Sequence, residues 1–233
     1  MIKRFTLLVL FYTIFTSTIF AQFKSLNVGP VYSNHSRSEL DKYVDFFTAA
    51  TGLPAMAMAN AYGVSFSVSS GNGSIQGIFG GSYTYGLNST VSSDKLKSLV
   101  LKQGNFNLNF GLDKYIVPWF FVGGQFLVTS FSGKTKYKNT GDPSPSDTLI
   151  GNTGDNSNIF LGYGIGIRGE TGFYIPFKTE DSGVKIQGYY DLGLSKYNFY
   201  DSFDKVITSY TGDKKTMGNA FGVQLLFAIP MGR

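Results

Sequence analysis

A strict alternation of apolar and polar residues between Asn105 and Asp113 constrains the fold more than any other feature of the sequence. Its apolar positions are Phe106, Leu108, Phe110 and Leu112, and Asn, Gly or Asp stands between them. Because successive side chains of a β-strand point to opposite faces, this stretch predicts a strand with one apolar and one polar face. Phe120–Phe131 alternates in the same way after a short link, so the two stretches predict an antiparallel hairpin.

The alternation recurs along the chain and predicts about eight strands. They are Ser25–Ser33, Ala61–Ser69, Ile75–Leu87, Asn105–Asp113, Phe120–Phe131, Ile159–Phe177, Val184–Ser195 and Ala220–Ile229. The predicted short links are Ser70–Gly73, Asp113–Val117 and Lys178–Gly183. The predicted long links are residues 34–56, 88–102, 132–157 and 196–216. Alternating short and long links and an even number of strands are typical of an outer-membrane barrel, whose short turns face the periplasm.

The polar face of the strands decides which side of such a barrel faces outward. It consists mainly of Gly, Ser, Asn and Gln and carries few charges, whereas a strand face in water normally carries many. Small hydrogen-bonding side chains suit the narrow interior of an eight-stranded barrel. The sequence therefore predicts an all-β, transmembrane, antiparallel up-and-down barrel with apolar side chains toward lipid, rather than a soluble barrel with an apolar interior.

The N-terminus has the layout of a secretory signal peptide. A short basic start that includes Lys3 and Arg4 precedes the apolar run Phe5–Phe20, and cleavage is expected after Ala21. We therefore expect a signal peptide over residues 1–21, exported through the Sec route, and a barrel domain over residues 22–233. The formal charge of +5 falls to +3 without Lys3 and Arg4, which is too low to indicate nucleic-acid binding.

One stretch follows the spacing of a helix instead of a strand. Ser38–Ala50 carries apolar residues at helical intervals, and Gly52 and Pro54 end the pattern. Ser38 and Asp41 resemble a capping box with Asp in place of the usual Glu or Gln. We expect a short amphipathic helix in the first long link, packed on the barrel rim.

These features resemble those of small outer-membrane barrels of Gram-negative bacteria, the class of the OmpA transmembrane domain, OmpX and PorT-like proteins. The resemblance is carried by the signal peptide, the strands Asn105–Asp113 and Val184–Ser195, and the aromatic C-terminal strand through Phe227. It implies location in the outer membrane, in contact with its lipid and with lipopolysaccharide. The chain differs from the class at its end, because six residues follow Phe227 where an aromatic residue usually ends the chain.

The few charged residues of the inward face have both signs. They are Asp113, Arg168, Glu170, Lys185 and Asp191. Because a buried charge needs a partner, we expect these residues to form a lumen charge network, with Arg168 bonded to Asp191, Glu170 or both.

Other motifs give weaker indications. Gly164–Gly169 matches a dinucleotide-binding pattern, but it lies inside a predicted strand with no helix after it, so no cofactor is expected. His35 beside Ser36, together with Ser93-Asp94, has the residue types of an acyl-transfer site, although a solvated loop histidine is the simpler interpretation. Asp155–Asn158 lacks the glycine and final glutamate of a calcium loop, so no metal is expected.

Further charged residues lie in the predicted outer loops. The acidic ones are Asp142, Asp147, Asp155, Asp201, Asp204 and Asp213. Lys134, Lys136 and Lys138 alternate at the base of the third long link and either face solvent or meet lipopolysaccharide phosphates.

The sequence leaves three functions open. The favoured one is a non-enzymatic barrel with a structural, surface-interaction or envelope- or secretion-complex accessory role, which includes an envelope protein partner. The second is a narrow porin-like channel for small solutes, although an eight-stranded lumen is filled by side chains. The third is a lipid A-modifying acyltransferase or deacylase.

Overall fold

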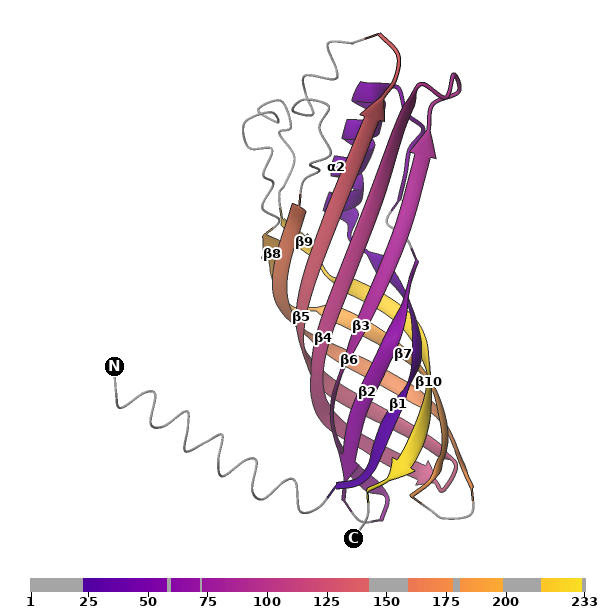
Figure 1. Cartoon of the computed structure of the whole chain (residues 1–233). Coiled ribbons are helices and arrows are strands. Elements are labelled where there is room, and N and C mark those ends of the chain that lie inside the picture. The colour runs from indigo at the N-terminus through magenta and orange to yellow at the C-terminus, as the bar shows by residue number, and fades with distance from the viewer. Residues whose placement is uncertain are drawn as a thin grey trace, which may run out of the picture.

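The computed structural model describes residues 23–57, 60–71, 73–142, 159–177, 181–198 and 215–231. Eight antiparallel strands form a closed barrel in the order β1-β10-β7-β6-β5-β4-β3-β2 (Figure 1). Their bounds are β1 Phe23–Ser36, β2 Ala61–Ser70, β3 Ile75–Val91, β4 Lys97–Val117, β5 Phe120–Asn139, β6 Ile159–Pro176, β7 Gly183–Gly193 and β10 Asn219–Pro230. The predicted all-β barrel of eight strands is confirmed.

The two faces of the strands have the predicted polarity. On β4, Phe110 and Leu112 are 51% and 58% exposed, whereas Asn107 and Asn109 are 7% and 6% exposed. Around the ring the outward positions are mostly exposed apolar residues and the inward positions are mostly buried polar ones, with buried apolar side chains such as Phe121, Leu127 and Leu226 among them. The barrel thus turns its apolar side outward.

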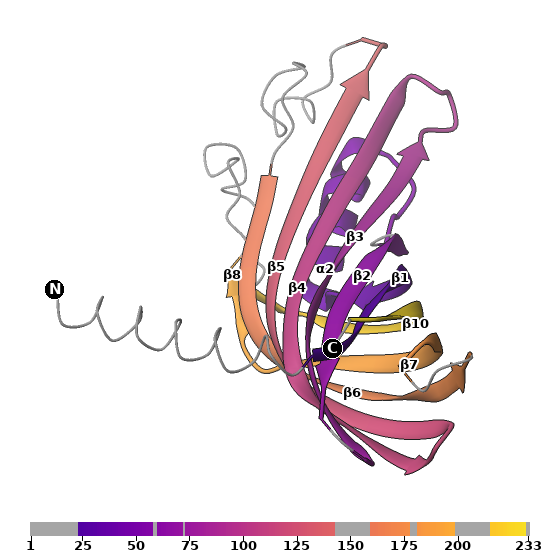
Figure 2. The same ribbon diagram turned by 60° about the horizontal axis from the view of Figure 1, so that its bottom comes forward.

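Three strands extend beyond the rest of the barrel (Figures 1 and 2). Pairing of β2 with β3 ends at Ala61 and Gly86, but β3 continues along β4 to Val91, and β4 pairs with β5 as far as Asn139. We call this extension the wall: residues 87–91 of β3, 97–102 of β4 and 133–139 of β5. Two predicted links are therefore wrong in length. Residues 88–102 contain only a five-residue link, 92–96, and residues 132–157 begin with eight strand residues.

The physical reason for both errors is the change of surroundings along the strand. Polar residues interrupt the outward face of the wall, so the apolar template that identifies a lipid-facing strand fails there; they are Ser89 between the exposed Leu87 and Val91 of β3, Ser98 and Lys102 of β4, and Lys134, Lys136 and Lys138 of β5. A smaller correction concerns β4, which continues through Val117 and leaves only Pro118 and Trp119 as the link to β5.

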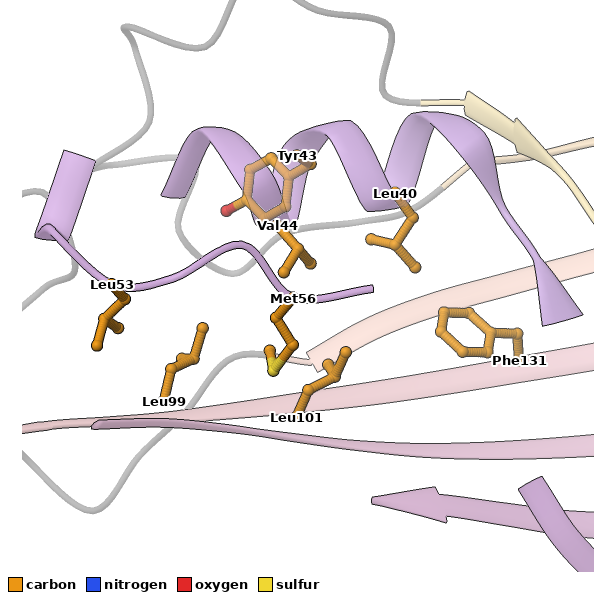
Figure 3. Close-up of a cluster of buried hydrophobic side chains, with 8 residues drawn as sticks. All are labelled: Leu40, Tyr43, Val44, Leu53, Met56, Leu99, Leu101 and Phe131. Carbon is orange, nitrogen blue, oxygen red and sulfur yellow. The ribbon is translucent and has the colours of Figure 1, made fainter. Parts of the chain in front are cut away.

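Helix α2 (Ser38–Thr51) lies in the first long link as predicted, and Gly52 ends it in the left-handed conformation with φ 72°. The expected capping box is wrong, because the N-cap is Arg37 and its side chain makes no capping bond. The helix packs on the wall through a hydrophobic cluster, shown in Figure 3. Its members are Leu40, Tyr43, Val44, Leu53, Met56, Leu99, Leu101 and Phe131.

Hydrogen bonds fasten the helix and the segment after it to the wall. The ammonium group of Lys97 donates to the carbonyl of Thr51 at 3.2 Å, at the C-terminal end of α2. The amide of Asn88 donates to the carbonyl of Ala57 at 2.8 Å, on the edge of β3 that β2 leaves uncovered. The wall and α2 therefore form one packed unit above the barrel.

The remaining links are described only in part. The predicted loop 196–216 begins with β8 (Lys196–Asn198) and ends within β9 (Lys215–Met217), which pair as a small two-stranded sheet. The predicted signal peptide, residues 1–21, lies outside the described residues and stays a prediction. No helix among the described residues is long and apolar enough to cross a membrane.

Candidate functional site

Arg168 and Asp191 meet inside the barrel as direct cross-strand partners on β6 and β7. The guanidinium donates from Nε to Oδ1 at 2.7 Å and from Nη2 to Oδ2 at 2.9 Å, which is a bidentate ion pair. Its carbon lies 3.9 Å from the ring centre of Tyr189. Arg168 and Asp191 are 3% and 4% exposed, so both charges are removed from water and neutralise each other.

A second ion pair crosses the lumen. Lys185 of β7 donates to Oδ2 of Asp113 on β4, although β5 and β6 separate these strands in the ring. The same ammonium group lies 3.9 Å from Oε1 of Glu170 and 4.1 Å from the ring centre of Phe121. The structure thus places the five residues of the expected network in two groups, the Arg168–Asp191 pair and the group of Lys185, Asp113 and Glu170.

Amide side chains extend these groups across the barrel. Gln125 and Gln187 donate to the two oxygens of Glu170, at 2.6 Å and 3.1 Å. Gln187 also donates to Gln224 of β10 at 3.0 Å, and Asn109 donates to Gln125. The network therefore links β4, β5, β6, β7 and β10 through side chains alone.

Close packing accompanies this network. A Cβ atom at Gly123 would lie 2.2 Å from Oδ1 of Asp113 and 2.9 Å from Cγ of Glu170, so only glycine fits between the two carboxylates. The cavities at the two ends of the lumen have volumes of about 20 Å³ and about 10 Å³. Each is close to the space that one water molecule needs. The buried side chains of the network occupy the middle of the lumen.

The upper end of the lumen holds residues that the sequence analysis misplaced or missed. His35 was expected in a solvated loop, but it lies in β1, is 8% exposed and points into the barrel. Its Nε2 lies 3.1 Å from the amide nitrogen of Asn105, and Arg37 donates to the amide oxygen of the same residue. The guanidinium of Arg37 stacks 3.9 Å from the ring centre of Phe131. His35 has the parity of Ser33, so extending the first strand would have placed it inward.

The other chemical motifs do not assemble around His35. Asp94 accepts hydrogen bonds from the Ser92 hydroxyl and the Leu96 amide in the link between β3 and β4. The bond from Ser92 is the main reason that the pKa of Asp94 lies below its usual value. Gly164–Gly169 lies within β6, in a strand as expected.

In the part of the chain that the structure describes, no three His, Cys, Asp or Glu residues are grouped as metal ligands. Asp155–Asn158 and the acidic residues Asp147, Asp201, Asp204 and Asp213 lie outside the described residues.

No family model matches the chain, and no curated protein matches its sequence. Solved structures give distant likenesses. Ail, the attachment invasion locus protein of Yersinia pestis, has a TM-score of 0.42 at 12% identity, over 89% of this chain and 99% of Ail. Neisserial surface protein A has a TM-score of 0.39 at 8% identity, over 89% of this chain and 96% of its own. The outer-membrane protease OmpT of Escherichia coli has a TM-score of 0.39 at 9% identity, over 90% and 96%.

The surface of the chain itself gives the class of the barrel. Its ring of strands is closed, its outward face is apolar, and its inward face is polar and hydrogen-bonded. A closed ring leaves no unpaired strand edge in the hydrocarbon, which a spanning sheet requires. An apolar outward band and alternating inward polar residues are the features of a membrane barrel of the outer-membrane type.

Proposed function

We propose that this protein is a non-enzymatic outer-membrane barrel whose lumen is a structural support and whose function lies on the wall and α2. The observation that carries the proposal is the cross-linked lumen, in which Lys185 reaches Asp113 across the barrel and Gln125 and Gln187 hold Glu170. A network that occupies the lumen serves stability rather than transport. The accessory or surface-interaction role then belongs to the part that stands beyond the barrel.

The wall suits that role because it is rigid without being part of the closed ring. Its three strands are paired along their whole length, and α2 buries Leu99 and Leu101 to 1% and 0% exposure. Three strands with a packed helix have the hydrophobic contact that an isolated hairpin lacks. We propose that the wall and α2 present a fixed surface to outer-leaflet lipid, to lipopolysaccharide and to an envelope protein partner.

Planar-bilayer recording separates this proposal from the narrow channel. The refolded full-length protein should show no discrete current steps above a detergent blank. The double variant Gln125→Ala with Arg168→Ala removes two lumen-filling side chains and serves as the opened control, checked for folding by its heat-modifiable gel mobility. Steady unitary conductance of the unaltered protein would contradict the proposal, whatever the double variant does.

Mass spectra of lipid A test the enzymatic alternative. Cells with and without the gene should give the same acylation pattern, because His35 is buried and bonds to Asn105 instead of a nucleophile. A change of acylation that depends on the gene and disappears in the His35→Ala variant would show an enzyme and overturn the non-enzymatic assignment.

A further inference from the structure

In the strands that the structure describes, the outward face of the barrel and wall carries only positive side-chain charges. The acidic residues of β4, β6 and β7 are Asp113, Glu170 and Asp191, and all three point into the lumen. On the outward face of the wall the charged residues of the described strands are Lys102 of β4 and Lys134, Lys136 and Lys138 of β5. The four lysines are exposed and cover two neighbouring strands. They form what we call the lysine patch.

The register makes this patch unusual. Lys102 and Lys134 are direct cross-strand partners, and Lys136 and Lys138 follow at the next two outward positions of β5, opposite Val100 and Ser98. Like charges directly opposite each other on neighbouring strands are destabilising. Such an arrangement is favourable when an anion lies between the ammonium groups. The pairing therefore points to a ligand with closely spaced negative charges.

The height of the patch on the barrel indicates where that anion comes from. Gly104 lies one outward position below Lys102, and it pairs with Tyr85 on β3 and Ser132 on β5. Tyr85 and its neighbour Tyr83 are 42% and 49% exposed on the same outward face. Tyrosine rings at a membrane boundary lie at headgroup level, with an apolar body and a hydrated hydroxyl.

One outward step along a strand is about 7 Å, so the lysine patch begins directly above this tyrosine level. Lysine side chains at such a position keep their ammonium group among the headgroups while their stems lie along the apolar surface. The patch thus stands where the phosphates of the facing leaflet are.

We propose that the lysine patch binds the phosphates of a bisphosphorylated glycolipid, the lipid A part of lipopolysaccharide, in the outer leaflet. This inference rests on the proposed function, which places the wall on the outer side of the outer membrane. The ammonium groups of Lys102, Lys134 and Lys138 in one patch match a lipid with more than one phosphate better than a phospholipid with a single one. Lysine binds phosphate as a point charge, so the ligand is held by charge and position rather than by bidentate bonds.

Binding to bisphosphorylated lipid A in nanodiscs tests the patch. The double variant Lys102→Gln with Lys134→Gln should bind about tenfold or more weakly than the unaltered protein, since each lysine near an anionic surface contributes roughly a fivefold change. Lys114→Gln is the matched control, because Lys114 is an exposed, outward residue at the other end of β4. Dephosphorylated lipid A should bind equally to all three proteins, and phosphatidylglycerol, which carries a single phosphate, should show a smaller loss in the double variant than bisphosphorylated lipid A does.

Thermal unfolding gives a second readout, because the order of stability of the double variant and the unaltered protein should differ between detergent and lipid A. In uncharged detergent, the double variant should be as stable as the unaltered protein or more stable, because the opposed charges are gone. In lipid A nanodiscs the order should reverse. Equal lipid A binding by the double variant and the unaltered protein, an equal loss in Lys114→Gln, or no preference for the phosphorylated lipid would each overturn the inference. The bilayer recording would be unaffected by that result, so the two proposals fail separately.

Discussion

Strand β4 presents its side chains in opposite ways in the barrel and in the wall. In the barrel, outward Phe106 is 41% exposed while inward Asn107 is 7% exposed. In the wall, inward Leu99 and Leu101 are buried against α2, and outward Lys102 is exposed. The polarity of the two faces therefore inverts within a single strand, between residues 102 and 106.

The inversion follows from what each face touches. In the barrel the outward face meets lipid and the inward face meets a crowded, hydrogen-bonded lumen. In the wall the inward face packs on an apolar helix, and the outward face carries exposed lysines on β4 and β5 beside the exposed Leu87 and Val91 of β3. The comparison shows that period-two alternation identifies a strand, whereas the surroundings decide which of its faces is apolar.

The largest effect should come from breaking the lumen network. Arg168→Ala leaves Asp191 buried without its ion pair and should cost about 3–5 kcal/mol of stability. The expected result is a lower temperature for loss of the heat-modifiable gel shift. The double variant Arg168→Ala with Asp191→Ala should recover part of the lost stability, because no charge is then left buried without its partner. A single variant as stable as the unaltered protein would show that the network does not support the barrel.

A lysine introduced on the outward face should lower stability by an amount that depends on its position along the strand, in the barrel or in the wall. Phe110→Lys sets a charge against lipid at mid-strand and should cost about 2–4 kcal/mol. Val100→Lys, on the same face of the same strand but in the wall, should cost only about 0.2–1 kcal/mol, because the new charge lies opposite Lys136 but not against lipid. Asn107→Ser, on the inward face, should be nearly silent. Equilibrium unfolding in lipid vesicles measures the stability of all three variants. Equal losses of stability at positions 100 and 110 would show that barrel and wall do not differ in their surroundings.

The smallest effect should be local to α2. Val44 is 2% exposed in the cluster between α2 and the wall, and Val44→Ala removes apolar contact worth about 1–2 kcal/mol. Hydrogen exchange of α2 should rise while the gel shift of the barrel stays unchanged. Asp45→Ala, at the next and exposed position, is the control and should leave exchange unaffected. Simultaneous loss of helix and barrel protection would show that the two parts unfold together.

The sequence was sufficient to predict the barrel, because the two-residue period of a strand determines which side chains point inward and which point outward. The parity of Ile167 and Arg168 alone placed one toward lipid and the other in the lumen, and the short turn before β7 brought Arg168 to Asp191. Most of the wall was missed, apart from the strand-like Leu99–Leu101, because polar residues interrupt the outward face of Ser98–Lys102 and occupy that of Lys134–Asn139. Local pattern also could not show that Leu99 and Leu101 contact a helix some fifty residues earlier in the chain.

The upper lumen shows a similar limit. Arg37 follows β1 and precedes α2, so neither a strand nor a helix pattern covers it, and its bond to Asn105 spans 68 residues. Contacts of that kind depend on the closed ring, which brings β1 and β4 to the same lumen. Sequence reasoning recognised Asn105 only as a member of a polar face.

Single-cysteine labelling of intact cells tests the inversion most directly, because the chain has no cysteine of its own. Val128→Cys, Ser132→Cys and Lys136→Cys place thiols at three heights on the outward face of β5. A membrane-impermeant maleimide should label position 136 rapidly, position 132 more slowly, and position 128 only after the barrel is denatured. Rapid labelling at 128, or labelling at 136 only after the outer membrane is opened, would contradict a lipid-facing barrel below an outer wall.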